Sequence, residues 1–196
     1  MFWDGKITSR QKQGILTYLR IPRSNPTQAD YRPINLLNSD YKIQARMVER
    51  RLRPTIEDHL TYTQYCVIPG YTLLDAVATG CDSIAYAESK KKHCVFSLDF
   101  KNAFDRVSHG YLFKIIHGYG IGSPLINGIW HLCEGATSSK QINDHQYGPI
   151  PVRCAVRQDC PMSMALYKLS LHSLLKVLEQ KLPGLRMETK NVKHRL

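Results

Sequence analysis

A short apolar segment that runs into a carboxylate constrains the fold of this chain more than any other feature. Residues 94–99 have the sequence Cys-Val-Phe-Ser-Leu-Asp. If side chains alternate as in a strand, Cys94, Phe96 and Leu98 share one face. Asp99 then lies on the other face, where the end of the strand meets solvent. This position suits a metal ligand, although a carboxylate that ends a strand or caps a turn is the ordinary alternative for an isolated Asp.

Asp99 is not isolated, because residues 97–107 continue as Ser-Leu-Asp-Phe-Lys-Asn-Ala-Phe-Asp-Arg-Val. This stretch resembles the first catalytic motif of reverse transcriptases, in the form used by non-LTR retrotransposons of the long-interspersed-element type. Further blocks match the same family in the family's order, at residues 30–42, 64–70 and 155–163. The resemblance covers about residues 12–187, and an ordered set of blocks is stronger than any single one.

The resemblance implies an α+β fold, made of the fingers and part of the palm of a right-hand reverse transcriptase. Its helices are expected to pack on a small antiparallel sheet. Residues 1–196 would form a single partial domain. In it, about residues 12–92 are fingers-like, about 93–187 are a partial palm, and 188–196 are a divergent tail.

Local patterns predict the individual elements. Besides the strand before Asp99, they indicate a strand at 16–22, an extended segment at 31–34, and a hairpin of 138–142 with 148–154 across residues 143–145. Apolar residues at helical spacing predict helices at 38–60, 73–87, 108–118, 124–133 and 161–182. Pro54 is expected to kink the first of these helices.

The charge balance favours a polyanionic partner. The chain has 27 Lys and Arg against 16 Asp and Glu, a formal net charge of +11. This balance suits nucleic acid, although a basic surface that only keeps the protein soluble is the alternative. The ordered motifs favour nucleic acid, and the partners that the resemblance implies are an RNA template and a DNA primer.

The sequence predicts an intracellular protein, in the nucleus or the cytoplasm. No apolar run approaches the roughly 20 residues of a membrane span, and the first residues lack the apolar core of a secretory signal. The 6 cysteines form no Cys-x-x-Cys pair, so we expect reduced core thiols rather than disulfides or zinc. The oligomeric state is not predicted.

The resemblance makes Asp99 a catalytic residue and a magnesium ligand. In the family, this Asp shares two Mg²⁺ with an Asp-Asp pair of a later motif, and the ions stabilise the attacking and leaving oxygens of phosphoryl transfer. The 196 residues contain no Asp-Asp pair. One of roughly three carboxylates cannot hold two ions in octahedral geometry, so we expect a truncated and catalytically incomplete domain.

Other site residues follow from their positions in the motifs. Arg23 and Arg32 match the basic residues that hold the triphosphate of the incoming nucleotide. Phe104 matches the aromatic residue under the nucleotide sugar, with Phe100 beside it, although an aromatic after a strand usually packs in the core. Gln158 matches the glutamine near the new base pair and the template.

Arginines supply the expected contacts with nucleic acid. Arg46, Arg50 and Arg53 lie on the outer face of the helix predicted at 38–60. A charge run of this kind is often only a solvated face, which is the alternative here. Arg157, just before the matched glutamine, is also assigned to nucleic acid.

Asp159 departs from the family pattern, which has glycine where the backbone must approach nucleic acid closely. A side chain and a negative charge there count against activity. Two other hypotheses for the whole chain therefore stay open. One is a non-catalytic RNA-binding module that keeps the basic fingers surface, and the other is a degenerate product with no function.

The purified protein is expected to show no primer extension on an RNA template with Mg²⁺ or Mn²⁺, because the Asp-Asp pair is missing. Gel analysis of a labelled primer checks this. Extension that disappears in Asp99→Asn would contradict the prediction.

Overall fold

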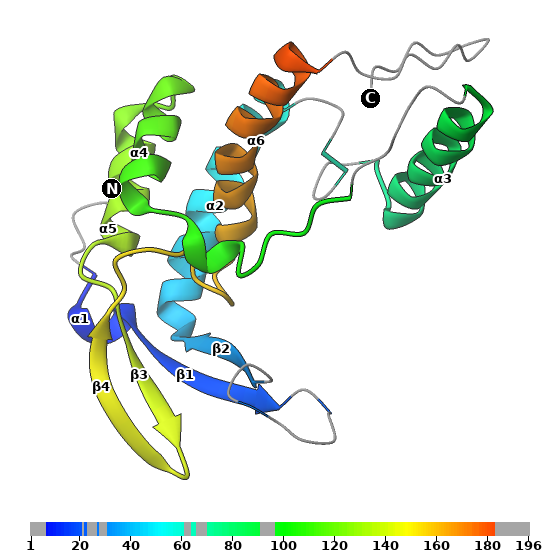
Figure 1. Cartoon of the computed structure of the whole chain (residues 1–196). Helices are drawn as coiled ribbons and strands as arrows, with labels where there is room; N and C mark the ends of the chain where they lie inside the picture. The colour runs from blue at the N-terminus through cyan, green and yellow to red at the C-terminus, as the bar shows by residue number, and fades with distance from the viewer. Residues whose placement is uncertain are drawn as a thin grey trace.

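The structure, a computed structural model, describes residues 7–20, 22, 27, 31–60, 64–65, 70–90 and 97–182, without the side chains of Arg32 and Lys90. Figure 1 shows helices gathered on one side of a small sheet. In chain order the elements are α1 (Ser9–Lys12), β1 (Gln13–Arg20), β2 (Tyr31–Leu37), α2 (Ser39–His59), α3 (Leu73–Lys90), the 3-10 helix η2 (Phe104–Arg106), α4 (His109–Gly118), α5 (Ser123–Cys133), β3 (Thr137–Ile142), β4 (His145–Pro151) and α6 (Ser163–Lys181). The predicted α+β class is confirmed.

The strands form one 4-stranded sheet in the order β2-β1-β3-β4. β1 pairs antiparallel with β2, and β3 pairs antiparallel with β4. However, β1 and β3 run parallel, with Gln13 beside Thr137 and Leu16 beside Lys140. The prediction of an antiparallel sheet is therefore wrong for this central pair. Parallel strands need a long crossover connection, and the helical chain between β2 and β3 supplies it.

The β3–β4 hairpin turns more tightly than predicted. Asn143 and Asp144 have φ of 47° and 62°, and Ile142 pairs directly with His145. This is the geometry of a type I′ turn, which needs positive φ at both central residues and favours Asn and Asp there. His145 therefore begins β4 instead of ending the turn, and the strand stops earlier than predicted, at Pro151.

The helix predicted at 38–60 is confirmed as α2, and it continues past Pro54 to His59. Its buried apolar face is made of Tyr41, Ala45, Val48, Leu52 and Ile56, at the helical spacing that predicts the helix. Asn38 occupies the N-cap position, but its side chain makes no capping bond. Instead its amide donates to the carbonyl of Arg10 over 2.8 Å, which ties the start of α2 to α1.

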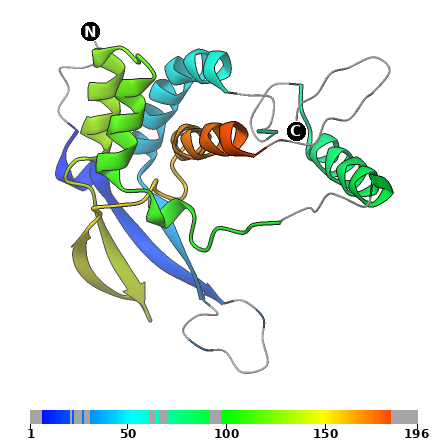
Figure 2. The ribbon, with the colours of Figure 1, turned by 45° about the horizontal axis from the view of Figure 1, so that its top comes forward.

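One apolar core lies between α2, α4, α5 and α6 (Figure 2). Leu52, Leu112, Ile129 and Leu169 are fully buried in it, one from each of these helices. Val107 is also buried, so it can pack with Leu112 as a hydrophobic staple at the start of α4. In the described part of the chain, no helix has the length and apolar character to cross a membrane.

The strand predicted before Asp99 is not observed where the structure describes it. Residues 94–96 lie outside the described residues, and residues 97–100 have no regular secondary structure. Leu98, expected on a packed face, is 77% exposed. A strand needs a partner for its backbone groups, and no strand of the described sheet pairs with this segment. The prediction is therefore wrong for Ser97 and Leu98.

The helix predicted at 73–87 is confirmed as α3, which lies apart from the other helices (Figures 1 and 2). It presents apolar side chains to solvent, since Leu73, Leu74 and Val77 are 80%, 77% and 54% exposed. The main core therefore does not include this helix.

Leu112→Ala is expected to lower the free energy of unfolding by about 2–5 kcal/mol, because it leaves a cavity in a fully buried site. The matched control Leu74→Ala removes the same atoms from an exposed site, so it should change that energy by less than about 0.5 kcal/mol. Urea unfolding monitored by circular dichroism measures both. Equal losses in the two variants would contradict this assignment of the core.

Candidate functional site

The sequence blocks at residues 97–107 and 155–163 lie side by side. The amide of Ala155 donates to the carbonyl of Val107, and the amide of Val156 donates to that of Phe104, each over 2.9 Å. Next to these bonds, Ser108 and Cys154 form an isolated antiparallel bridge. The loop of residues 155–163, which we call the 155–163 loop, is thus held against the segment that follows Asp99.

Arg157 fixes the 155–163 loop to the sheet. Its guanidinium donates from Nη1 to the carbonyl of Lys12 over 2.7 Å and from Nη2 to the carbonyl of Thr137 over 3.2 Å. It also lies over the ring of Tyr41, 5.2 Å from the centroid. Arg157 is only 6% exposed, so a bound nucleic acid would not reach its guanidinium. We therefore assign it a structural role in place of the expected contact with nucleic acid.

Gly14 in β1 makes room for this arrangement. A Cβ at Gly14 would overlap the side-chain oxygen of Asn35 and the Nη2 atom of Arg157. Asn35 in turn donates to Ser138 Oγ over 3.2 Å. Any larger residue at position 14 would push the guanidinium away from the carbonyls that it joins.

Asp159 has a left-handed backbone with φ of 65°, a conformation that favours glycine. Its carboxylate accepts a hydrogen bond from the amide of Leu37 over 3.3 Å and pairs with Lys42 Nζ over 2.5 Å. Both partners belong to the sequence block at residues 30–42, at the end of β2 and the start of α2. The side chain that departs from the family pattern is therefore held toward α2 by these two bonds.

The segment around Asp99 is open to solvent. Asp99 is exposed and Phe100 is 50% exposed, in an irregular stretch. Among the described residues, no group of three or more His, Cys, Asp or Glu side chains is arranged to hold a metal ion. The residues that the structure describes therefore do not make a magnesium site by themselves.

Phe104 packs partly against the core, and its ring stacks on Tyr167 of α6 with centroids 4.7 Å apart. Next to it, burial raises the pKa of the Asp105 carboxyl above its usual value. Gln158, which follows the buried Arg157, is half-buried. Sequence reasoning missed Tyr167, since nothing in a helical apolar pattern shows which aromatic ring a distant phenylalanine will meet.

Of the two arginines expected at the triphosphate, only the backbone of Arg32 belongs to the described part of the chain. Arg23 lies outside the described residues, and so does the side chain of Arg32. The backbone of Arg32 belongs to β2, where it pairs with Leu19 of β1.

The arginines of α2 differ from one another. Arg46 and Arg50 are exposed. Arg53 donates from Nη2 and Nε to one carboxylate oxygen of Glu49, over 2.7 and 3.0 Å. This hydrogen bond and the charge of Glu49 raise the pKa of Arg53. Arg46 and Arg50 are thus the α2 arginines of this set that face solvent without a described carboxylate partner.

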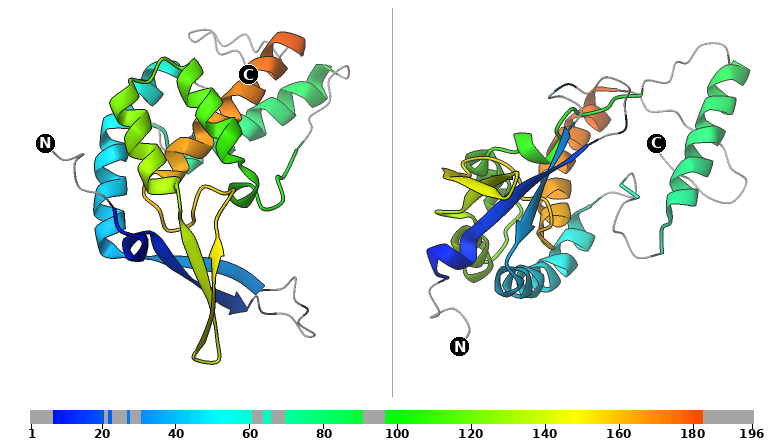
Figure 3. Two further views of the ribbon diagram at one scale, coloured as in Figure 1. Left: turned by 90° about the vertical axis from the view of Figure 1, so that its left-hand side faces the viewer. Right: turned by 90° about the horizontal axis from the view of Figure 1, so that it is seen from below.

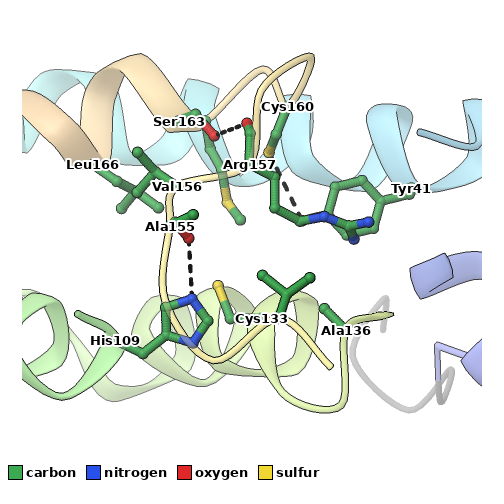
Figure 4. Close-up of a pocket in the computed structure, with 12 residues that line it drawn as sticks. Tyr41, His109, Cys133, Ala136, Ala155, Val156, Arg157, Cys160, Ser163 and Leu166 are labelled. Carbon is green, nitrogen blue, oxygen red and sulfur yellow. Dashed lines mark hydrogen bonds between the residues drawn. The ribbon is translucent and has the colours of Figure 1, made fainter. Parts of the chain in front are cut away.

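A small cavity lies behind the 155–163 loop (Figure 4). Its lining includes Tyr41, His109, Cys133, Arg157 and Cys160. The space that the centre of a water-sized sphere can occupy in this cavity is about 10 Å³. That is enough for one water molecule and far too little for a nucleotide. Burial raises the pKa of the Cys133 thiol to about 12, so this cysteine stays protonated. The cavity is a packing feature and not a substrate pocket.

Arg157→Lys is expected to lower the free energy of unfolding by about 1.5–3 kcal/mol, because a lysine ammonium cannot donate to two carbonyls in the planar geometry of a guanidinium. Chemical denaturation measures the change. Arg153→Lys, at an exposed position nearby, serves as the control and should be neutral. A neutral Arg157→Lys would contradict the structural role.

Comparison with known proteins identifies the family. Residues 21–194 match the family described as "Reverse transcriptase (RNA-dependent DNA polymerase)". The "Transposon TX1 uncharacterized 149 kDa protein" of Xenopus laevis is 31% identical over 185 residues, which are 94% of this chain and 14% of that protein. The "Retrovirus-related Pol polyprotein from type-1 retrotransposable element R2" of Popillia japonica is 29% identical over 82% of this chain and 22% of that protein.

The chain therefore spans less than a quarter of the length of these relatives. The match nevertheless covers nearly all of its own residues, including every block that the motifs predicted. The predicted family is confirmed, and this chain belongs to the reverse transcriptases, as a reverse transcriptase domain of the non-LTR retrotransposon type.

Proposed function

We propose that this chain provides the fingers-like part and part of the palm of an RNA-directed DNA polymerase. The observation that carries the proposal is the meeting of the sequence blocks at the 155–163 loop. Backbone bonds join this loop to Phe104 and Val107, and Asp159 joins it to Leu37 and Lys42. Motifs that a polymerase must assemble around one nucleotide are thus adjacent in this fold.

The proposed division of the chain falls near residue 92, with a tail at 188–196. In this proposal, β1, β2 and α2 belong to the fingers-like part, and the segment from Asp99 onward to the partial palm. The β3–β4 hairpin comes later in the chain but completes the same sheet through its parallel pairing with β1. The sheet therefore draws strands from both sides of the proposed boundary.

We assign Asp99 as this chain's contribution to the magnesium site that reverse transcriptases use. Its exposed carboxylate is free to approach a bound nucleotide, as the role requires. When bound, Mg²⁺ stabilises the charge that develops on phosphate oxygens. A working site needs further carboxylates, so the chain by itself is proposed to be inactive.

Nucleotide and template contacts are proposed from the remaining motif residues. Arg23 and Arg32 would hold the triphosphate, while Phe104, with Phe100 beside it, would lie under the sugar. The stacking of Phe104 on Tyr167 supports this role, because it holds the ring in one orientation.

Gln158 is proposed to pack near the new base pair. The half-buried position of this side chain, directly after the anchored Arg157, supports a fixed orientation. Along α2, the exposed Arg46 and Arg50 would contact backbone phosphates of RNA. Arg53 is the weaker candidate for this contact, because Glu49 already holds its guanidinium.

A chimera tests the proposal, with this chain joined to the part of the Xenopus TX1 relative that follows the matched region. Primer extension on RNA with Mg²⁺ should appear, and Asp99→Asn should lower its rate by about 100-fold or more, since a metal ligand is lost. Asp105→Asn is the matched control, because Asp105 lies in the 3-10 helix η2, six residues after the position that matches the metal ligand, and it should keep most of the activity.

Asp159→Gly in the same chimera should raise the rate severalfold, because glycine adopts the left-handed backbone without strain, and this gain is expected to exceed the loss of the bonds to Leu37 and Lys42. Equal rates for Asp99→Asn and the parent chimera would contradict the polymerase assignment. Inactivity together with RNA binding would favour the non-catalytic RNA-binding module instead.

A further inference from the structure

The two faces of the sheet differ in chemistry. Strand pairing places Arg20 beside Tyr31, and Lys140 beside Tyr147. Because side chains alternate along each strand and paired residues share a face, one face carries all the tyrosines of the described sheet. This tyrosine face carries Tyr18, Tyr31 and Tyr147 with Arg20, Lys140 and His145, and the same register adds Leu16, Pro33, Ile142 and Ile150 to it. The opposite face, called the aliphatic face for its Ile15, Leu19, Ile34 and Leu36, also carries Thr17, Arg32, Gln141 and Gln146.

The helical body covers only one end of the tyrosine face. At that end, Arg157 and Asn35 pack over Gly14, which lies on the same face. Farther along the strands, Tyr31 and Tyr147 are 39% and 54% exposed. Figures 1 and 3 show the β3–β4 hairpin extending away from the helices. The tyrosine face is therefore open over its outer half.

Cations stand next to the exposed rings. Arg20 neighbours Tyr31 on the β1–β2 side, Lys140 neighbours Tyr147 on the β3–β4 side, and Tyr18 lies on β1 between these two pairs. Three strand spacings of about 4.8 Å separate β2 from β4, so the tyrosine face is about 14 Å wide. Two acids lie close to these residues along the chain, Asp30 directly before Tyr31 and Asp144 in the hairpin turn.

We propose that the tyrosine face binds single-stranded RNA. Aromatic rings on an open sheet stack with unpaired bases, and adjacent cations neutralise phosphates. The choice of RNA rests on the proposed function, and the tyrosine hydroxyls can also bond ribose 2′-hydroxyls. Arg32 falls on the aliphatic face by register, so this surface is separate from the expected triphosphate contact.

Binding of a fluorescent 20-nucleotide oligouridine RNA to the whole chain tests the proposal. Tyr147→Ala should weaken binding by about fivefold or more, the effect of losing one stacked base. Leu19→Ala is the matched control, because Leu19 is 55% exposed on the aliphatic face, close to the 54% of Tyr147. It should change the affinity by less than about twofold.

Salt dependence tests the cations separately. Replacing Arg20 and Lys140 together by Gln should lower the slope of log affinity against log salt by about 1.4, or 0.7 for each phosphate contact. Tyr147→Phe should keep most of the affinity for RNA, because stacking persists. It should reduce the preference over oligothymidine DNA of the same length, because the hydroxyl is lost.

Equal losses of RNA affinity in Tyr147→Ala and Leu19→Ala, or an unchanged salt slope in the Arg20 and Lys140 double variant, would overturn the proposal that the tyrosine face binds RNA. Equal binding of the RNA and DNA oligomers by the parent chain would overturn the assignment to RNA. The absence of any RNA binding by the parent chain would also overturn this proposal. The polymerase proposal fails independently, if the chimera with Asp99 intact extends no primer.

Discussion

A buried guanidinium holds this fold together. Arg157 joins the carbonyls of Lys12 and Thr137, which lie 145 and 20 residues away in the sequence, and covers the ring of Tyr41. A charge in such a place must be matched by acceptors, because an unpaired buried charge is costly. The last residue of α1, just before β1, and the first residue of β3 provide those acceptors, and Gly14 leaves the space for the side chain. Arg157 thus couples the position of the 155–163 loop to the parallel pairing of β1 and β3 at the centre of the sheet.

The neighbouring residues in that loop take their places from this anchor. Asp159, two residues on, turns through a left-handed conformation and reaches the start of α2 through Lys42. On the other side, Ala155 and Val156 hold the segment that ends with Val107. Polar bonds to the backbone and the burial of Val107, Val156, Cys160 and Met162 in the apolar core together bring the matched sequence blocks to one place.

Local patterns predicted the helices well, because an apolar stripe such as that of α2 is encoded within the helix itself. The role of Arg157 could not be predicted in this way. Its burial depends on Lys12, Tyr41 and Thr137, which are distant in sequence, so a basic residue beside a nucleotide motif indicated nucleic acid. Leu98 shows the same limit, since alternation describes a strand only where a partner strand is present. The family resemblance predicted the function, but not which basic residues face solvent.

Native-state hydrogen exchange at the amides of Ala155 and Val156 tests the central arrangement most directly. These amides donate to Val107 and Phe104, so they should be protected nearly as strongly as the amide of Leu166, which bonds to Met162 at the start of α6. Exchange of Ala155 and Val156 at the rate of the exposed, irregular Leu98 would contradict the account. In that case the 155–163 loop would not be held against the segment after Asp99, and the sequence blocks would not share one site.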